Sequence, residues 1–310
     1  MDTSEYLEYL RADGEALAAA ARRAPDAHIG SCPEWDMTDL LAHVGGVHRW
    51  VDEMVTAKAS KYIPRHSPEL EGFEDTLAWY EEGLAHLLAT LAAADPEEPV
   101  WNWADRKPAP ALFWIRRMAL ETAIHRWDGE GGHVHGGEIH ETADDHDHGG
   151  HDHEHEAHDH GHEGHDHGHE GHDHGHEAHK HEAHGHEAHE HEAQGGEVGP
   201  GRPQPIATDL AVDGIDEYLG FVGLWLAYQP VPGLEGSLHL HATDTAGEWS
   251  MVLSPEAMEL RREHVKSDVA IRASASDLLL WLLNRVPADS PSLKVFGESE
   301  IVELWRSLQF

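Results

Sequence analysis

The sequence predicts a protein of the α plus α+β class, with a helical bundle at residues 1–130 and a small α+β domain at residues 231–310. Apolar residues recur at helical spacing through the first segment, whereas they alternate with polar residues after Pro232. Between the two segments, residues 131–201 are rich in His, Asp, Glu and Gly and lack apolar periodicity, so we expect this insertion to be disordered. A helix within residues 202–230 is expected to pack on the bundle.

The first segment is predicted to form four amphipathic helices joined in an antiparallel bundle. In the second helix, Leu40, Val44, Val47 and Val51 recur three or four residues apart, which places them on one face. Prolines in the segment before the fourth helix are expected to break the chain there. The predicted helices cover residues 4–22, 38–57, 69–93 and 109–129.

The last part of the chain alternates apolar and polar residues, which is typical of strands with one buried face. We expect these strands to form an antiparallel sheet. The predicted strands cover residues 237–243, 248–253, 258–264, 268–274 and 293–296, and helices are predicted at residues 208–228, 275–285 and 298–308.

The charge balance argues against several classes of partner. The chain of 310 residues has 21 Lys and Arg against 59 Asp and Glu, a net charge of −38. Binding to nucleic acid or to an anionic membrane requires clusters of cations that this sequence lacks, so neither partner is expected. The longest apolar runs fall short of the ~20 residues of a membrane helix, and no signal peptide is visible. With Cys32 as the only cysteine, no internal disulfide can form, and we expect a cytoplasmic protein.

Three residues of the predicted bundle could hold a metal ion. Glu121 and His125 are four residues apart and therefore share one face of the fourth helix. His43 lies at the edge of the apolar stripe of the second helix, and His48 flanks the other edge. Two histidines and one glutamate from facing helices would form a three-ligand site with an open position, as in catalytic zinc sites. Periodicity does not choose between His43 and His48.

The same residues have a second interpretation. Glu and His four residues apart are common on solvated helix faces, and a single buried histidine is more often hydrogen-bonded than bound to metal. The residue pattern therefore leaves both interpretations open.

Two stretches of the bundle resemble a known family. CPEWDMTDLLAHVGGVHRW (residues 32–50) and RRMALETAIHRWDGE (residues 116–130) resemble the signatures of the mycothiol-dependent maleylpyruvate isomerase family, whose helical domain belongs to the DinB-like four-helix superfamily. DVAIRASASDLLLWLLNRVP and the following LKVFGE resemble that family's C-terminal, sterol carrier protein-like domain. The resemblance covers the chain on both sides of the His-rich insertion.

The resemblance implies a zinc-type site held by His43, Glu121 and His125, and mycothiol, a low-molecular-weight thiol, as cosubstrate. It also implies an arginine of the C-terminal domain that holds substrate carboxylate, for which Arg285 is the candidate by position. The thiolate would add to the cis double bond of a dicarboxylate such as maleylpyruvate, allow rotation, and leave. A thiol S-transferase acting on another small electrophile would use the same residues, so the resemblance implies an isomerase or a transferase.

The insertion is a separate candidate for metal binding. Of the 32 histidines, 23 lie between His133 and His191, and from Glu154 to His181 the sequence repeats every seven residues. Imidazoles at every second or third position, with carboxylates nearby, suit Zn²⁺, Ni²⁺ or Cu²⁺. An alternative function is therefore metal buffering or storage, with a non-catalytic site in the bundle. The histidines of the repeats and their border are His151, His153, His155, His158, His160, His162, His165, His167, His169, His172, His174, His176, His179 and His181.

Overall fold

The computed structural model describes most of the chain outside the His-rich tract. The prediction of disorder and the fourteen predicted metal-binding histidines from His151 to His181 lie outside the described residues. The described ranges are 1–66, 68–104, 109–131, 203–297 and 300–307.

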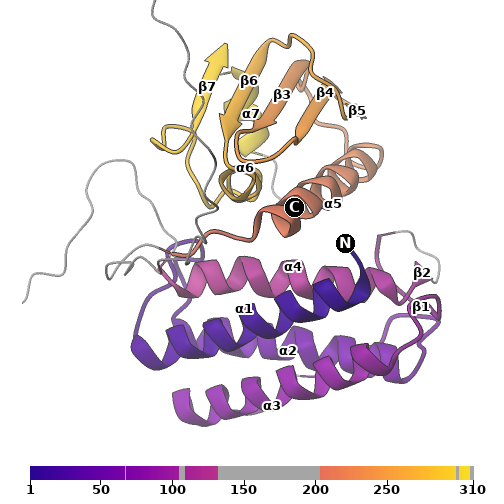
Figure 1. Ribbon diagram of the computed structural model, residues 1–310, viewed down its shortest axis with the longest axis vertical. Helices are drawn as coiled ribbons and strands as arrows, with labels where there is room; N and C mark the ends of the chain where they lie inside the picture. Colours follow the sequence, from indigo (N-terminus) through magenta and orange to yellow (C-terminus); the bar gives the residue numbers. More distant parts are fainter. Residues whose placement is uncertain (67, 105–108, 132–202, 298–299, 308–310) are drawn as a thin grey trace, which may run out of the picture. The chain divides into compact units, whose positions relative to one another are not determined.

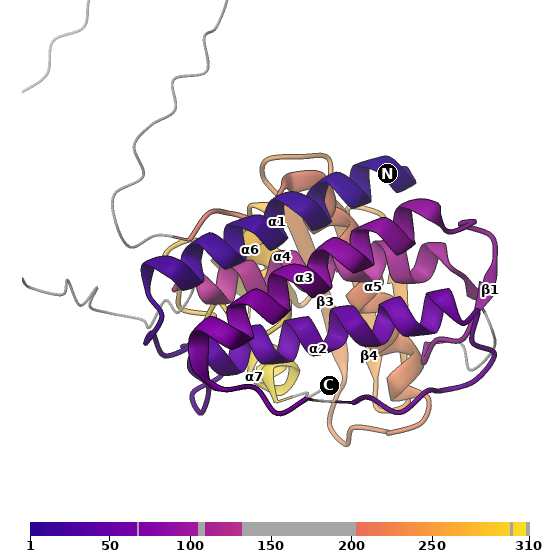
Figure 2. The same ribbon diagram turned by 90° about the horizontal axis from the view of Figure 1, so that it is seen from below.

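The first part of the chain forms the predicted four-helix bundle. Figures 1 and 2 show the four helices side by side, and α1 contacts α3 and α4 while α2 contacts α3 and α4. The helices are α1 (Thr3–Arg23), α2 (Met37–Thr56), α3 (Gly72–Ala93) and α4 (Leu112–Gly129). A short antiparallel pair, β1 (Pro99–Val100) with β2 (Ala109–Pro110), precedes α4 and was not expected from the sequence.

Capping boxes fix where two of the helices begin. The Asp2 side chain accepts a hydrogen bond from the backbone N–H of Glu5, and the Glu5 side chain accepts one from the backbone N–H of Asp2. Asp36 and Asp39 form the same reciprocal pair at the start of α2. Each box satisfies backbone donors that the first helical turn leaves unpaired. The second box starts the helix that carries His43.

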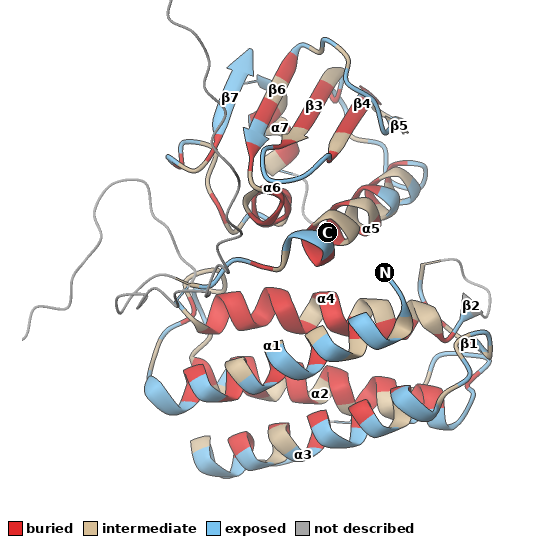
Figure 3. Ribbon diagram, in the orientation of Figure 1, coloured by how far each residue is buried: buried red, intermediate tan, exposed pale blue. Residues whose placement is uncertain are grey.

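Helix α4 is enclosed on nearly all sides, unlike a helix at the surface of a bundle. Figure 3 shows its second half almost entirely buried, and all residues from Met118 to Gly129 except Glu121 are classed as buried. It contacts α1 and α2 of the bundle and α5 (Thr208–Leu226) from beyond the tract. Polar side chains of α4 therefore lie in a protein interior, where they need partners.

The C-terminal part forms a five-stranded sheet in the order β5-β4-β3-β6-β7 (Figure 1). The strands are β3 (Gly236–Ala242), β4 (Glu248–Ser254), β5 (Ala257–Arg261), β6 (Val269–Ala273) and β7 (Lys294–Gly297). The sheet is antiparallel, as expected, at every pairing except one, because β3 and β6 pair in parallel and the sheet is therefore mixed. The long connection from β4 through β5 lets β6 return beside β3 in the same direction.

Helix α6 (Ala275–Leu282) contacts β3, β6 and α5, and α7 (Glu300–Arg306) follows the last strand. A single hydrophobic cluster includes Leu120 of α4, Leu219 of α5, Leu240 of β3 and Leu279 of α6. The bundle and the C-terminal domain are thus joined by shared apolar burial, which is the main favourable contribution to folding. Among the described residues, no helix has the length and apolar character needed to span a membrane.

Candidate metal centre

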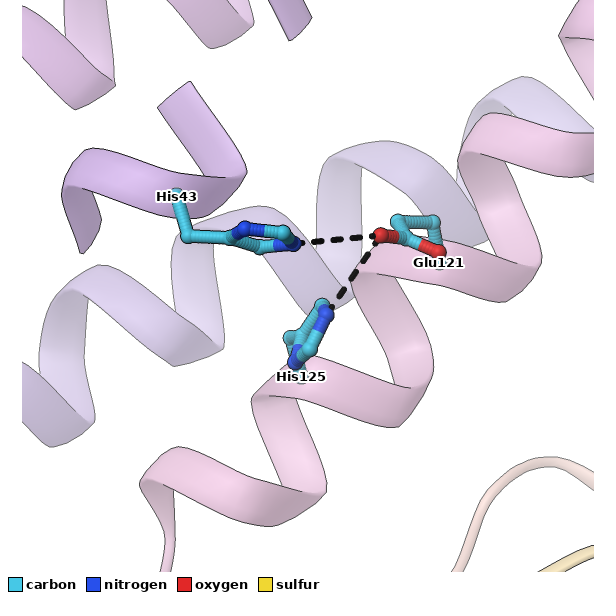
Figure 4. A group of neighbouring side chains, drawn as sticks. All are labelled: His43, Glu121 and His125. Carbon is cyan, nitrogen blue, oxygen red and sulfur yellow. Dashed lines mark ion pairs between the residues drawn. The ribbon is translucent and has the colours of Figure 1, made fainter. Parts of the chain in front are cut away.

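His43 of α2 and the pair Glu121 and His125 of α4 converge on one point (Figure 4). His43 Nε2 lies 3.6 Å from Glu121 Oε1, and His125 Nε2 lies 3.4 Å from the same oxygen. One ligand atom from each residue lies within 4.8 Å of the others. Metal ligands at about 2.0–2.2 Å from a common ion are separated by such distances, so the three side chains fit a divalent metal.

The site is buried on the α4 side and open on the α2 side. The His125 and Glu121 side chains are 9% and 13% exposed, whereas that of His43 is 31% exposed. The Trp35 ring, in the segment before α2, lies 4.8 Å from the His43 ring. A small molecule would therefore approach past His43 and Trp35, with Glu121 and His125 fixed beneath it.

The second nitrogen of His125 is held by a buried carboxylate. His125 Nδ1 is 2.9 Å from Asp128 Oδ2, three residues further along α4. Burial alone would lower the pKa of His125, but the hydrogen bonds with Asp128 and Glu121 outweigh it and raise the pKa to about 9. With Nδ1 committed to Asp128, Nε2 is the nitrogen that faces His43 and Glu121. This carboxylate–histidine arrangement is the usual support of a metal-bound imidazole.

Asp128 is itself fixed from two sides. Ser31 Oγ donates to its Oδ1 at 2.6 Å, and the Arg285 guanidinium donates to both of its oxygens at 3.2 and 3.1 Å. Burial would raise the pKa of Asp128, but the hydrogen bond with His125 and the charge of Arg285 lower it to about 2. Asp128 is therefore a charged acceptor for His125 at any pH near neutral.

Glu121 divides its two oxygens between different partners. Oε1 faces the two histidines, and Oε2 accepts a hydrogen bond from Arg117, one helical turn earlier. Arg117 also donates to Glu217 of α5 at 3.1 Å. Burial would raise the pKa of Glu121, but the charge of Arg117 and the two histidines lower it well below its usual value. The carboxylate is thus ionised and oriented with one oxygen toward the site.

His48 does not join this cluster, although the sequence allowed it. It is fully buried, and its Nε2 lies 2.9 Å from the Thr122 hydroxyl. Burial lowers the pKa of His48 to about 3, so its imidazole is neutral. The structure therefore brings His43 to Glu121 and His125, and it gives His48 the role of a hydrogen-bonded residue of the interior.

Arg285 lies beside the site but is already engaged. Besides its two hydrogen bonds to Asp128, its Nη1 donates to the Leu283 carbonyl at 3.0 Å. The guanidinium thus supports His125 through Asp128. Its predicted role in holding substrate carboxylate stays a prediction.

Cys32 is near these groups but does not supply a thiolate. Burial and the charge of Asp128 raise the pKa of the Cys32 thiol. Since the sequence has only this cysteine, a thiolate nucleophile at the site would have to come from a cosubstrate.

Sequence reasoning did not single out Asp128, Arg117 or Ser31. Two of them had a detectable signal, because Arg117 precedes Glu121 by four residues and Asp128 follows His125 by three, which are the spacings of neighbours on a helix. Ser31 comes from a connecting segment, and no spacing rule relates it to α4.

Two family models match the chain. The mycothiol maleylpyruvate isomerase N-terminal domain matches residues 6–129, and the MDMPI C-terminal domain matches residues 209–303. The first match contains all three residues of the candidate metal centre, and the second contains Arg285. No curated protein matches the chain.

Two solved structures are similar across the whole chain. A crystal structure of the mycothiol-dependent maleylpyruvate isomerase is 12% identical, with a TM-score of 0.51 and coverage of 96% of this chain and 95% of that chain. A histidine-to-alanine mutant of that isomerase is 11% identical, with a TM-score of 0.53 and the same coverage. At such low identity, the similarity concerns the fold.

Proposed function

Because this chain belongs to the mycothiol-dependent maleylpyruvate isomerase family, we propose that it is a metal-dependent enzyme that uses mycothiol as cosubstrate. Its reaction is the cis–trans isomerisation of an unsaturated dicarboxylate, or the transfer of the thiol to another small electrophile. The observation that carries this proposal is the convergence of His43, Glu121 and His125, each with a ligand atom within 4.8 Å of the others. The proposal places the enzyme in the cytoplasm, where a low-molecular-weight thiol is available.

The donor set suits zinc, because two imidazoles and one carboxylate leave a coordination position open for a further ligand. When bound, such a metal favours the thiolate form of a coordinated thiol, which is the nucleophile. His43, Glu121 and His125 would hold the metal. Asp128 keeps the proton of His125 on Nδ1, and Arg117 keeps the second oxygen of Glu121 turned away from the site.

The reaction itself requires few further groups from the protein. A thiolate that adds to the double bond of maleylpyruvate converts it to a single bond, about which the carbon skeleton can rotate. Elimination of the same thiolate then gives the trans isomer, so the thiol is regenerated. A cation that pairs with substrate carboxylate would hold the molecule during rotation, and Arg285 is our candidate for that role.

The test is a thiol-dependent assay of the full chain with zinc. We expect conversion of maleylpyruvate to fumarylpyruvate that requires mycothiol. This turnover should fall in Glu121→Gln by more than the ~10–100-fold that is typical when a residue that only supports a metal ligand is changed. Glu82→Gln is the matched control, since Glu82 pairs with Arg49 on the exposed surface of α3. Monochlorobimane, assayed in parallel, distinguishes thiol transfer from isomerisation.

Absence of both activities in the zinc-loaded chain would contradict the proposal, as would full activity in Glu121→Gln. Turnover of monochlorobimane without turnover of maleylpyruvate would identify a transferase.

Metal buffering is the second candidate function, favoured by the 23 histidines between His133 and His191. Deletion of residues 133–193 separates the two functions. If the tract is an accessory, the deleted chain supplied with zinc keeps its thiol-dependent turnover and loses only the binding of several metal equivalents. If buffering is the function, neither chain shows turnover.

A further inference from the structure

A second cluster of histidines lies on the sheet of the C-terminal domain, on elements that the metal centre does not use. His239 and His241 are two residues apart on β3 and therefore point to the same face. Glu248 begins β4 and is directly opposite His241 in the antiparallel register. His264 belongs to the segment between β5 and β6. Residues distant in the sequence thus gather on the face opposite Leu238 and Leu240.

One carboxylate lies at the centre of this cluster. His239 Nε2 is 2.5 Å from Glu248 Oε2, and His241 Nδ1 is 2.5 Å from Glu248 Oε1. His264 Nδ1 is 3.2 Å from Glu248 Oε1. The rings of His239 and His264 are 4.9 Å apart in an edge-to-face arrangement. Ligand atoms of His239, Glu248 and His264 all lie within 4.8 Å of one another.

The three imidazoles outnumber the acid that they share. One carboxylate beside three imidazoles forms a mixed set of oxygen and nitrogen donors. An imidazole nitrogen that carries a lone pair is a metal ligand. His241 differs from the other two, because its Nε2 is 3.5 Å from Arg272 Nη2 and a cation is therefore already beside it.

One histidine of the cluster is buried and another is exposed. His239 is 4% exposed, whereas the side chain of His264 is 73% exposed. A metal bound here would rest on a buried ligand from the sheet and be covered by an exposed ligand from the β5–β6 segment, leaving room for water as a further ligand. Two imidazole nitrogens and one carboxylate oxygen suit Zn²⁺ and related borderline ions more than Mg²⁺ or Ca²⁺, which prefer oxygen.

We propose that His239, Glu248 and His264 form a second divalent-metal site of the zinc class, with His241 as a positioning residue that holds the carboxylate. The site links β3 and β4 to the segment at residues 262–268. Binding of metal would therefore fasten that segment to the sheet. This site is independent of the proposed catalytic centre, since it shares no residue with it.

The first test uses the full chain and a residue-resolved readout, so that metal bound elsewhere in the chain does not contribute. Modification of His264 by diethyl pyrocarbonate is followed by peptide mass spectrometry at buffered concentrations of free zinc. At a free zinc concentration ten times the dissociation constant, we expect modification of His264 to fall about tenfold. Glu248→Gln keeps the side-chain shape but removes the charge, and it should abolish this protection. Exposed His86 of α3 is the internal reference.

Unchanged reactivity of His264 in the wild-type chain would overturn the proposal, and so would equal protection in Glu248→Gln. A second measurement covers the case in which that variant does not fold. Zinc should slow tryptic cleavage after Lys266, beside His264, and should not slow it in His264→Ala, which alters only an exposed side chain. Cleavage after Lys61 reports any effect of zinc on trypsin itself. Equal slowing in the wild type and in His264→Ala, or none in either, would also exclude the site.

Discussion

The state of His125 depends on a residue that is not itself a candidate ligand. Asp128 accepts the Nδ1 proton, and Ser31 and Arg285 hold Asp128 in place. Without this carboxylate, no acceptor would hold the Nδ1 proton, and the ring would no longer be fixed with Nε2 toward His43 and Glu121. Three residues from separate parts of the chain thus act on one imidazole nitrogen, and the hydrogen bonds of Asp128 with the other two and with His125 offset the cost of burying its charge.

His48 gives a prediction for the dependence of stability on pH. Its folded-state pKa is about 3, against 6.5 for an unperturbed histidine. Between these values the unfolded chain binds a proton that the folded chain does not, so the contribution of His48 is complete above pH 6.5 and is lost as pH falls toward 3. Compared with His48→Gln, the free energy of unfolding of the wild type should fall by about 1.4 kcal/mol more for each unit below pH 6.5.

Urea unfolding at several pH values between 4.5 and 7, with a chelator present, measures this difference. Gln can still form a hydrogen bond with Thr122 but does not titrate, and His86→Gln on the exposed face of α3 is the matched control. Parallel pH profiles for the wild type and His48→Gln would show that His48 is not held neutral in the folded chain.

Periodicity alone could not choose between His43 and His48, and the choice of His43 in the sequence analysis came from the family resemblance. They are five residues apart on one helix and flank the same apolar stripe, so local periodicity treats them alike. The choice depends on how α2 is rotated against its neighbours. In the structure, His43 faces the His125 ring of α4, whereas His48 lies against the Tyr80 ring of α3. Such rotation follows from packing across the whole bundle, which no single window of sequence contains.

At the scale of elements, a glycine of α5 lies in close contact with two neighbouring helices. A Cβ at Gly214 would lie 2.8 Å from Leu120 Cδ2 of α4 and 2.8 Å from Leu279 Cδ2 of α6. Both leucines are almost completely buried, so they have little room to move. Gly214→Ala should therefore lower the free energy of unfolding by about 1–2 kcal/mol, since overpacking costs ~1–3 kcal/mol and the gain in helix propensity is at most ~1 kcal/mol.

Gly220→Ala is the matched control on the same helix. Nothing lies within 4 Å of a Cβ at Gly220, so only helix propensity should change, raising stability by up to ~1 kcal/mol. Thermal or urea unfolding measures the free energy of unfolding of the two variants, which should change in opposite directions. Equal stabilisation by both substitutions would mean that α5 does not approach α4 and α6 this closely.

Periodicity predicted the helices and strands well and their pairing less well. The bounds of α2 and of β3 differ from the predicted ranges by one residue at each end. Alternation shows that a strand has one buried face, but it carries no information on which strand lies beside it or in which direction. The parallel pairing of β3 with β6 was missed for that reason. The two-residue strands β1 and β2 are too short to produce a period.

For the molecule as a whole, the helical bundle and the C-terminal domain are connected by charged pairs as well as by apolar packing. Arg116 of α4 donates to the carboxylate and the backbone carbonyl of Asp213. Arg117 donates to Glu217 and also to Glu121 of the candidate metal centre. The pair Arg117–Glu217 therefore connects α5 to Glu121, a proposed metal ligand, whereas the pair Arg116–Asp213 does not.

This difference predicts that Glu217→Gln weakens metal binding at His43, Glu121 and His125. In the wild type, Arg117 shares its positive charge between Glu121 and Glu217. In Glu217→Gln, the whole charge of Arg117 would act on Glu121. Because Arg117 would compete more strongly for that carboxylate and repel a cation, the free zinc concentration needed to protect His43 from diethyl pyrocarbonate should rise about fivefold or more.

Asp213→Asn is the control, because it weakens the other connection between α4 and α5 without touching Arg117. Both variants should lower the free energy of unfolding by about 1–3 kcal/mol, the usual loss for a hydrogen bond to a charged group. Only Glu217→Gln should change the zinc dependence of His43 protection. If both variants shift the zinc dependence of His43 protection equally, the metal centre responds to any loosening of the contact between α4 and α5. If neither variant shifts it, Arg117 does not transmit the charge of Glu217 to Glu121.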